Sequence, residues 1–149
     1  MKIVSRFNTR PESGGGRVLL DTNIFLEWLL GQQRADECRS LLERAQEGGI
    51  DVLVTDFALH SIAVIMERSG NKDELPGLFA TLASFEGLSV LHASLEEHSA
   101  VARLALETSL DFDDAYHAYF AQLRGVPLIS FDRHFDGIVE RKTPQEVLL

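Results

Sequence analysis

Short apolar runs alternate with longer amphipathic segments along most of the chain. The runs are rich in Val, Leu and Ile, a composition typical of strands buried on both faces of a parallel sheet. We expect four such strands, at residues 18–20, 50–54, 88–91 and 126–130. Between them, apolar residues recur every three or four positions, which predicts helices.

The predicted helices cover 23–30, 34–47, 55–68, 74–85, 95–107 and 113–123, with a short helical turn from 143. Asn23 is predicted to cap the first helix, because its short side chain accepts hydrogen bonds from free N–H groups. Thr143 is predicted to cap the last, with Pro144 at its first position. Strands that alternate with helices predict an α/β fold, in which helices cover both faces of a parallel sheet.

The chain of 149 residues is long enough for one domain with a substantial core. We expect that domain over 17–149, after a flexible leader over 1–16 that contains three consecutive glycines. The leader lacks the apolar segment of a secretory signal. No apolar run approaches the ~18 residues of a membrane span. These features predict a cytoplasmic protein without a membrane segment.

The formal net charge of −9 bears on the class of partner. Nonspecific nucleic-acid binding depends largely on basic side chains that neutralise phosphates, so an acidic chain disfavours it. A nuclease remains compatible with this charge, since bound cations offset acidic ligands. A basic partner protein is the other interpretation. The single cysteine, Cys38, rules out an internal disulfide and is expected to be a buried thiol.

Acidic residues follow two of the predicted strands. Asp21 closes the first strand, Asp132 comes two residues after the end of the fourth, and Asp136 lies four residues further on. Asp114 belongs to a third group, at the start of the helix between them. Ligands in open α/β sheets bind outside the carboxyl ends of the strands. We therefore expect these carboxylates to share one site, which suits a hard divalent cation such as Mg²⁺.

Simpler interpretations exist for several of these residues. Asp21 is compatible with a solvated turn. Acids in the first turn of a helix, such as Asp113, are favoured by the helix dipole without any metal. None of the five histidines has zinc-site spacing. Of these, only His134, inside the last acidic loop, is expected near the chemistry.

Three segments together resemble the PIN-domain family of ribonucleases, which includes VapC-type toxins of toxin–antitoxin pairs. They are 19–26 (LLDTNIFL), 113–118 (DDAYHA) and 128–136 (LISFDRHFD). Each segment is a weak motif, but their order and spacing match over about 17–140. The resemblance implies an α/β/α sandwich with a central parallel sheet. It also implies Mg²⁺- or Mn²⁺-dependent hydrolysis of RNA.

Residue by residue, the resemblance assigns metal binding to Asp21, Asp114 and Asp132, and adds Asp136 as a less regular catalytic acid. Ser130 matches a hydroxyl position near the metal. The resemblance further implies a homodimer and an antitoxin protein as partner. An apolar groove for a partner around Trp28 and Cys38 is one interpretation of those helices. Ordinary core is the preferred one.

The chain departs from the family pattern at one position. The family usually has a Glu in the third helix, where this chain has Ser61, or His60 if the register slips by one. Glu67 is about six residues further, roughly 9 Å along the helix, too far to replace it. Asp113 or Asp136 are candidates to supply the missing charge.

Three functions follow from these patterns. The preferred one is a metal-dependent ribonuclease, the toxin of a toxin–antitoxin pair. The alternative is a catalytically weakened or inactive PIN-like module that binds RNA or a protein. A phosphatase or receiver domain is disfavoured, because the 21–23 segment (DTN) lacks the second acid that those sites need.

Overall fold

The computed structural model describes residues 16–149. Five parallel strands form one sheet in the order β3-β2-β1-β4-β5. The strands are β1 (Arg17–Leu20), β2 (Asp51–Thr55), β3 (Leu88–Leu91), β4 (Leu128–Ile129) and β5 (Arg141–Lys142). β1 lies at the centre between β2 and β4, and so the ends of these three strands meet at one edge of the sheet.

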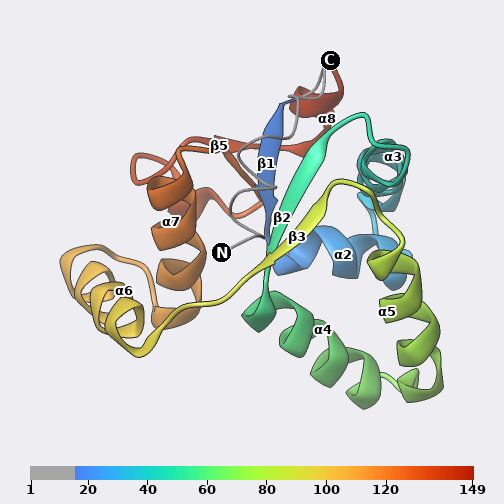
Figure 1. Cartoon of the computed structure of the whole chain (residues 1–149), viewed down its shortest axis with the longest axis horizontal. Helices are drawn as coiled ribbons and strands as arrows, with labels where there is room; N and C mark the ends of the chain where they lie inside the picture. Colours follow the sequence, from blue (N-terminus) through green and yellow to red (C-terminus); the bar gives the residue numbers. More distant parts are fainter. Residues whose placement is uncertain (1–15) are drawn as a thin grey trace.

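Helices connect the strands and cover the sheet. The α-helices are α2 (Thr22–Leu29), α3 (Ala35–Gln46), α4 (Asp56–Arg68), α5 (Leu75–Ala83), α6 (Leu95–Glu107), α7 (Phe112–Arg124) and α8 (Pro144–Leu148). Two short 3₁₀ helices, η1 (Lys72–Glu74) and η2 (Arg133–Phe135), lie in connections. Figure 1 shows α6 and α7 on one side of the sheet and α2 to α5 on the other.

Alternating strand side chains divide the interior into two cores. Val18, Leu20 and Val52 point to the side covered by α2, α3, α4 and α5. Leu19 and Leu53 point to the other side, where they pack with α7 residues such as Phe120. Period-two alternation on a sheet with both faces buried produces this division. The predicted α/β/α sandwich with a central parallel sheet is therefore confirmed.

Most predicted elements occur within two residues of their predicted ends, and 88–91 and 95–107 match fully. The predicted cap Asn23 is wrong. Asp21 is the N-cap of α2, and its carboxylate accepts a hydrogen bond from the Thr22 N–H, while Asn23 lies inside the helix. The fourth strand is shorter than predicted, and β5 was missed because its Arg-Lys pair has no apolar pattern.

Two further sequence predictions concern the ends of the chain. Thr143 caps α8 in a reciprocal arrangement with Glu146, and Pro144 occupies the first turn, as predicted. The leader predicted over 1–16 lies outside the described residues apart from Gly16. Within 16–149, no helix is both long and apolar enough to cross a bilayer.

Thr55 joins the fold to the edge where the strand ends meet. Its hydroxyl caps α4 by accepting from the Ala58 N–H at 3.0 Å, and it lies 3.2 Å from Nε2 of His117 on α7. Both Thr55 and His117 are buried. One hydroxyl thus ties β2, α4 and α7 together.

We predict that Thr55→Ala lowers the free energy of unfolding by about 1–3 kcal/mol, because it removes a helix cap and leaves a buried ring nitrogen without its partner. Urea denaturation measures the change. The control is Thr81→Ala, an exposed threonine within α5, which is expected to change stability little. Equal effects of the two variants would contradict the prediction.

Candidate metal centre

Asp21 and Ser130 meet where β1 and β4 end side by side. The Ser130 hydroxyl donates to Oδ2 of Asp21 at 2.7 Å, and the Thr22 N–H donates to Oδ1 at 2.7 Å. Asp21 is only 8% exposed, and Ser130 is fully buried. A buried carboxylate with a donor on each oxygen is held in one orientation.

Asp114 projects from the first turn of α7, the helix capped by Asp111. The Asp111 carboxylate accepts from the Asp114 N–H at 2.9 Å. Partial burial, followed by the negative charges of Asp111, Asp21, Asp132 and Asp113, raises the pKa of Asp114 to about 6. Crowded carboxylates of this kind take up a proton or a cation, because either one relieves their repulsion.

Asp132 begins η2 and completes the group. Its backbone N–H donates to the Ser130 hydroxyl at 3.0 Å, which joins it to Asp21 through one oxygen atom. Its Oδ1 accepts from the His134 N–H at 2.9 Å and lies 3.0 Å from Nδ1 of the same histidine. One ligand atom each from Asp114, Asp132 and His134 all lie within 4.8 Å of one another.

A pocket of about 260 Å³ contains all three of the acids predicted to bind metal. Most of its lining side chains are polar, and Leu26 and Phe57 are the apolar ones. The residues are Asp21, Thr22, Asn23, Leu26, Phe57, Ser61, Asp113, Asp114, His117 and Asp132. We call it the acidic pocket.

The two candidates for the family's Glu position line different pockets. Ser61 lines the acidic pocket, whereas His60 lines a separate one, which favours Ser61 at that position. Glu67 lies near the other end of α4 and pairs with Lys72 at 3.2 Å. Of the two candidates for the missing charge, Asp113 lines the acidic pocket.

Asp136 is not among the residues that line the acidic pocket. Its carboxylate binds Arg141 in a bidentate pair, with Oδ1 2.6 Å from Nε and Oδ2 3.2 Å from Nη2. Arg141 also donates to the Ser130 carbonyl at 3.0 Å. Asp136 therefore contacts the centre indirectly, through Arg141 and the backbone of Ser130.

Two residues of the pocket were not expected from the sequence. His117 is buried, and its Nδ1 lies 3.2 Å from the Asp113 carbonyl. A carbonyl only accepts, so a tautomer with the proton on Nδ1 accounts for this contact and leaves Nε2 to the Thr55 hydroxyl. Asn23 contributes Oδ1, a buried oxygen without a hydrogen-bond partner. The apolar pattern around Asn23 predicts a helix but does not indicate that the Asn23 side chain lines the acidic pocket.

The donor set fits a hard divalent cation. It is dominated by carboxylate oxygens, and Mg²⁺ and Mn²⁺ prefer such ligands. The raised pKa of Asp114 and the unpartnered Oδ1 of Asn23 both indicate a site with more acceptors than donors. A cation would supply the missing positive charge.

The comparisons with known proteins agree with this architecture. The PIN domain family profile matches residues 18–140, and the chain belongs to that family. No curated protein matches the sequence significantly. The fold is similar to three solved structures with TM-scores of 0.64 to 0.67.

The first of these is a toxin–antitoxin complex from Klebsiella pneumoniae, at 22% identity, covering 85% of this chain and 97% of the other. The second is VapBC2 from Rickettsia felis bound to a promoter DNA fragment, at 16% identity, covering 85% and 98%. The third is VapC20 from Mycobacterium tuberculosis, a toxin that cleaves the sarcin–ricin loop, at 17% identity, covering 83% and 97%. At these identities the likeness establishes the fold.

The region suggested as a partner groove divides into two parts. Cys38 and Leu42 belong to the core, as preferred from the sequence, and burial raises the pKa of the Cys38 thiol to about 12. Trp28 and Leu29 are half-buried and line an open pocket of about 420 Å³ with residues of α4 and α5. Trp28 and Leu29 are therefore accessible to a partner.

We predict that the contribution of Asp114 makes the metal-free protein less stable as pH rises from 4 to 7. Its pKa is about 6 in the folded state, above the usual value near 4, so the folded state holds the extra proton in this window. In EDTA at pH 7.5, Asp114→Asn should therefore stabilise the protein by about 1 kcal/mol, reduced by solvent screening.

Thermal unfolding at pH 4 and pH 7.5 measures this effect, which should largely vanish at pH 4. Asp73→Asn, an exposed acid in η1, is the matched control. Destabilisation by Asp114→Asn at pH 7.5 would contradict the assignment of Asp114 to a crowded acidic site.

Proposed function

We propose that this protein is a metal-dependent ribonuclease that hydrolyses RNA phosphodiester bonds. The observation that carries the proposal is the convergence of Asp21, Asp114 and Asp132 on one pocket at the carboxyl edge of a PIN-domain sheet. A toxin–antitoxin role is supported by the neighbours in solved structures, which include toxins and their complexes.

Asp21, Asp114 and Asp132 are the residues proposed to hold Mg²⁺ or Mn²⁺. When bound, the cation supplies Lewis-acid activation of water and neutralises charge on the phosphate. His134 adds a nitrogen ligand of the kind that Mn²⁺ accepts more readily than Mg²⁺. We therefore expect Mn²⁺ to bind more tightly than Mg²⁺.

The chain itself supplies orientation. Ser130 fixes the Asp21 carboxylate by donating to it and positions Asp132 by accepting from its backbone N–H. We assign to Asp132, the more accessible of these acids, the role of orienting water next to the phosphorus. Asp136 is proposed as a positioning residue that holds Arg141 against the Ser130 carbonyl.

A second candidate function rests on Ser61. A neutral hydroxyl lines the acidic pocket where the family usually has a carboxylate, which reduces the negative charge available to a cation. On this alternative, the domain is a catalytically weakened or inactive module that binds RNA or a protein. Asp113 partly compensates, because it lines the same pocket and contributes to the raised pKa of Asp114.

An antitoxin and a second copy of the chain are the proposed protein partners. The half-buried Trp28 and Leu29, which line an open pocket beside α4 and α5, are candidates for such contacts. Size-exclusion chromatography with light scattering tests the homodimer. A monomer at micromolar concentration would remove that part of the proposal.

We predict that RNA cleavage in Mg²⁺ or Mn²⁺ falls on the order of 100-fold or more in Asp21→Asn and Asp114→Asn, because each variant removes a proposed metal ligand. EDTA should abolish the wild-type activity. Asp73→Asn serves as the control for purification and charge. Equal cleavage by all of these proteins would identify the activity as a contaminant.

We predict that Ser61→Glu tightens Mn²⁺ binding about tenfold, because it adds a fourth carboxylate to an oxygen-ligand site. Isothermal titration calorimetry measures the affinity. Ser69→Glu, which places the same charge at the exposed far end of α4, is the control. No Mn²⁺ binding by the wild type, together with tight binding by Ser61→Glu, would favour the inactive module.

A further inference from the structure

A second pocket, of about 400 Å³, lies directly beside the acidic pocket. Its lining is formed by Asp56, Phe57, His60, His98, Phe112 and Tyr116. Phe57 lines both pockets, so the two adjoin at this side chain. The volume falls within the roughly 300–1,000 Å³ of small-molecule sites. We call it the aromatic pocket.

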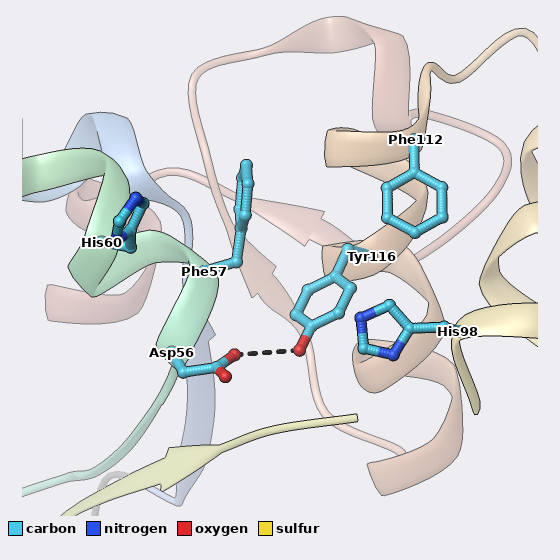
Figure 2. Close-up of a pocket in the computed structure, with 6 residues that line it drawn as sticks. All are labelled: Asp56, Phe57, His60, His98, Phe112 and Tyr116. Carbon is cyan, nitrogen blue, oxygen red and sulfur yellow. Dashed lines mark hydrogen bonds between the residues drawn. The ribbon is translucent and has the colours of Figure 1, made fainter. Parts of the chain in front are cut away.

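Rings from three helices form the aromatic pocket. Figure 2 shows Tyr116 of α7 between Phe57 of α4 on one side and Phe112 and His98 on the other. The centroid of Tyr116 lies 5.9 Å from Phe57 and 5.7 Å from His98. His98 and Phe112 are nearly parallel, with centroids 6.2 Å apart and planes at 21°.

These rings differ in exposure. Tyr116 is buried, whereas Phe112 is 42% exposed and His98 is also exposed. A large aromatic ring open to water at a pocket mouth gains free energy when a flat ligand covers it. Phe112 and His98 pack against each other and against Tyr116, and their exposed surface remains available for stacking with a ligand.

Asp56 supplies a fixed acceptor in the same pocket. The Tyr116 hydroxyl donates to Oδ1 of Asp56 at 2.9 Å and accepts from the Ala93 N–H at 3.1 Å. Its single proton is thus directed to Asp56, and the carboxylate is held in place. Oδ2 lies 4.0 Å from Nδ1 of His92, beyond hydrogen-bond distance, and the Asp56 side chain is 50% exposed.

We propose that the aromatic pocket binds an unpaired nucleobase of the RNA, next to the phosphate held at the acidic pocket. This inference rests on the proposed function for its substrate class. Stacking platforms of aromatic side chains are the usual means by which proteins hold single-stranded bases. Because Phe57 lines both pockets, the base and phosphate sites would lie next to each other.

The carboxylate predicts which base the pocket prefers. Asp56 only accepts hydrogen bonds, so it favours an edge with adjacent N–H donors. Guanine presents two, at N1 and N2, and suits bidentate contact with a carboxylate. Uracil has one donor between two carbonyl acceptors, which would face the negative charge. Guanine is therefore the preferred base and uracil the disfavoured one.

The test is a titration of the isotope-labelled protein with mononucleotides in Mg²⁺, followed by NMR. GMP, UMP and ribose 5-phosphate are the probes, and none contains a phosphodiester bond to cleave. GMP is expected to shift the resonances of Phe112, Tyr116 and His98 and to bind more tightly than UMP. Ribose 5-phosphate, which lacks a base, should leave these resonances in place.

Two variants and one control sharpen the result. Phe112→Leu should weaken GMP binding about tenfold, as loss of a stacking ring does. Asp56→Asn should remove the preference for GMP over UMP. Leu123→Ala, an exposed apolar position on the same helix α7 that does not line the pocket, should bind GMP as the wild type does.

Three outcomes would overturn the inference. They are equal shifts with ribose 5-phosphate, GMP affinity unchanged in Phe112→Leu, and saturation of the pocket by N-acetyl-arginine methylamide but not by GMP. The last would identify a site for an arginine of a protein partner. Because the probes are not cleaved, base binding and RNA cleavage are tested separately. GMP shifts in a wild type that does not cleave RNA would support the base site. A wild type that cleaves RNA but shows no GMP shifts would refute the base site and leave the proposed function intact.

Discussion

Repulsion between carboxylates at the carboxyl edge of the sheet is the constraint around which this structure is arranged. Asp21, Asp114 and Asp132 belong to three elements far apart in sequence, and β1 at the centre of the sheet brings them together. Hydrogen bonds partly offset the repulsion, since the Ser130 hydroxyl and the Thr22 N–H both donate to the Asp21 carboxylate. Among residues 16–149 no N–H or O–H group donates to the Asp114 carboxylate, and its pKa is raised first by partial burial and then by the neighbouring carboxylates.

Ser130 connects the residues of this arrangement because it forms hydrogen bonds with Asp21, Asp132 and Arg141. Its hydroxyl donates to Asp21 and accepts from the Asp132 N–H, while its carbonyl accepts from Arg141. Arg141 in turn is paired with Asp136. The positive charge of Arg141 is therefore paired with another acid and directed to the backbone of Ser130. The pocket keeps a negative field that a cation can satisfy, which an open arginine would have cancelled.

The sequence was sufficient to predict the fold and to predict that the three acids lie together, but not to identify the residues between them. Apolar runs and strand-end acids located Asp21 and Asp132, because periodicity and position in a parallel sheet are local signals. The sequence around His117 and Asn23 contains no such signal, because their roles depend on contacts across the fold. His117 lies next to Thr55 of β2, and Asn23 lines the acidic pocket. The prediction that Asn23 caps α2 was wrong because the helix begins earlier, at Thr22. Asp21 is its N-cap, and the Asp21 carboxylate accepts from the Thr22 N–H.

The charge of the chain bears on how an RNA would be recognised. With a net charge of −9, affinity cannot depend mainly on the release of counterions from phosphates by basic side chains. The remaining contributions are cation-mediated phosphate contact at the acidic pocket and apolar contact at the aromatic pocket. Stacking on an aromatic ring needs no basic side chain, and a carboxylate such as Asp56 repels phosphate while it accepts from a base edge. An acidic surface therefore disfavours binding along the RNA backbone and leaves unpaired bases as the feature that such a protein can select.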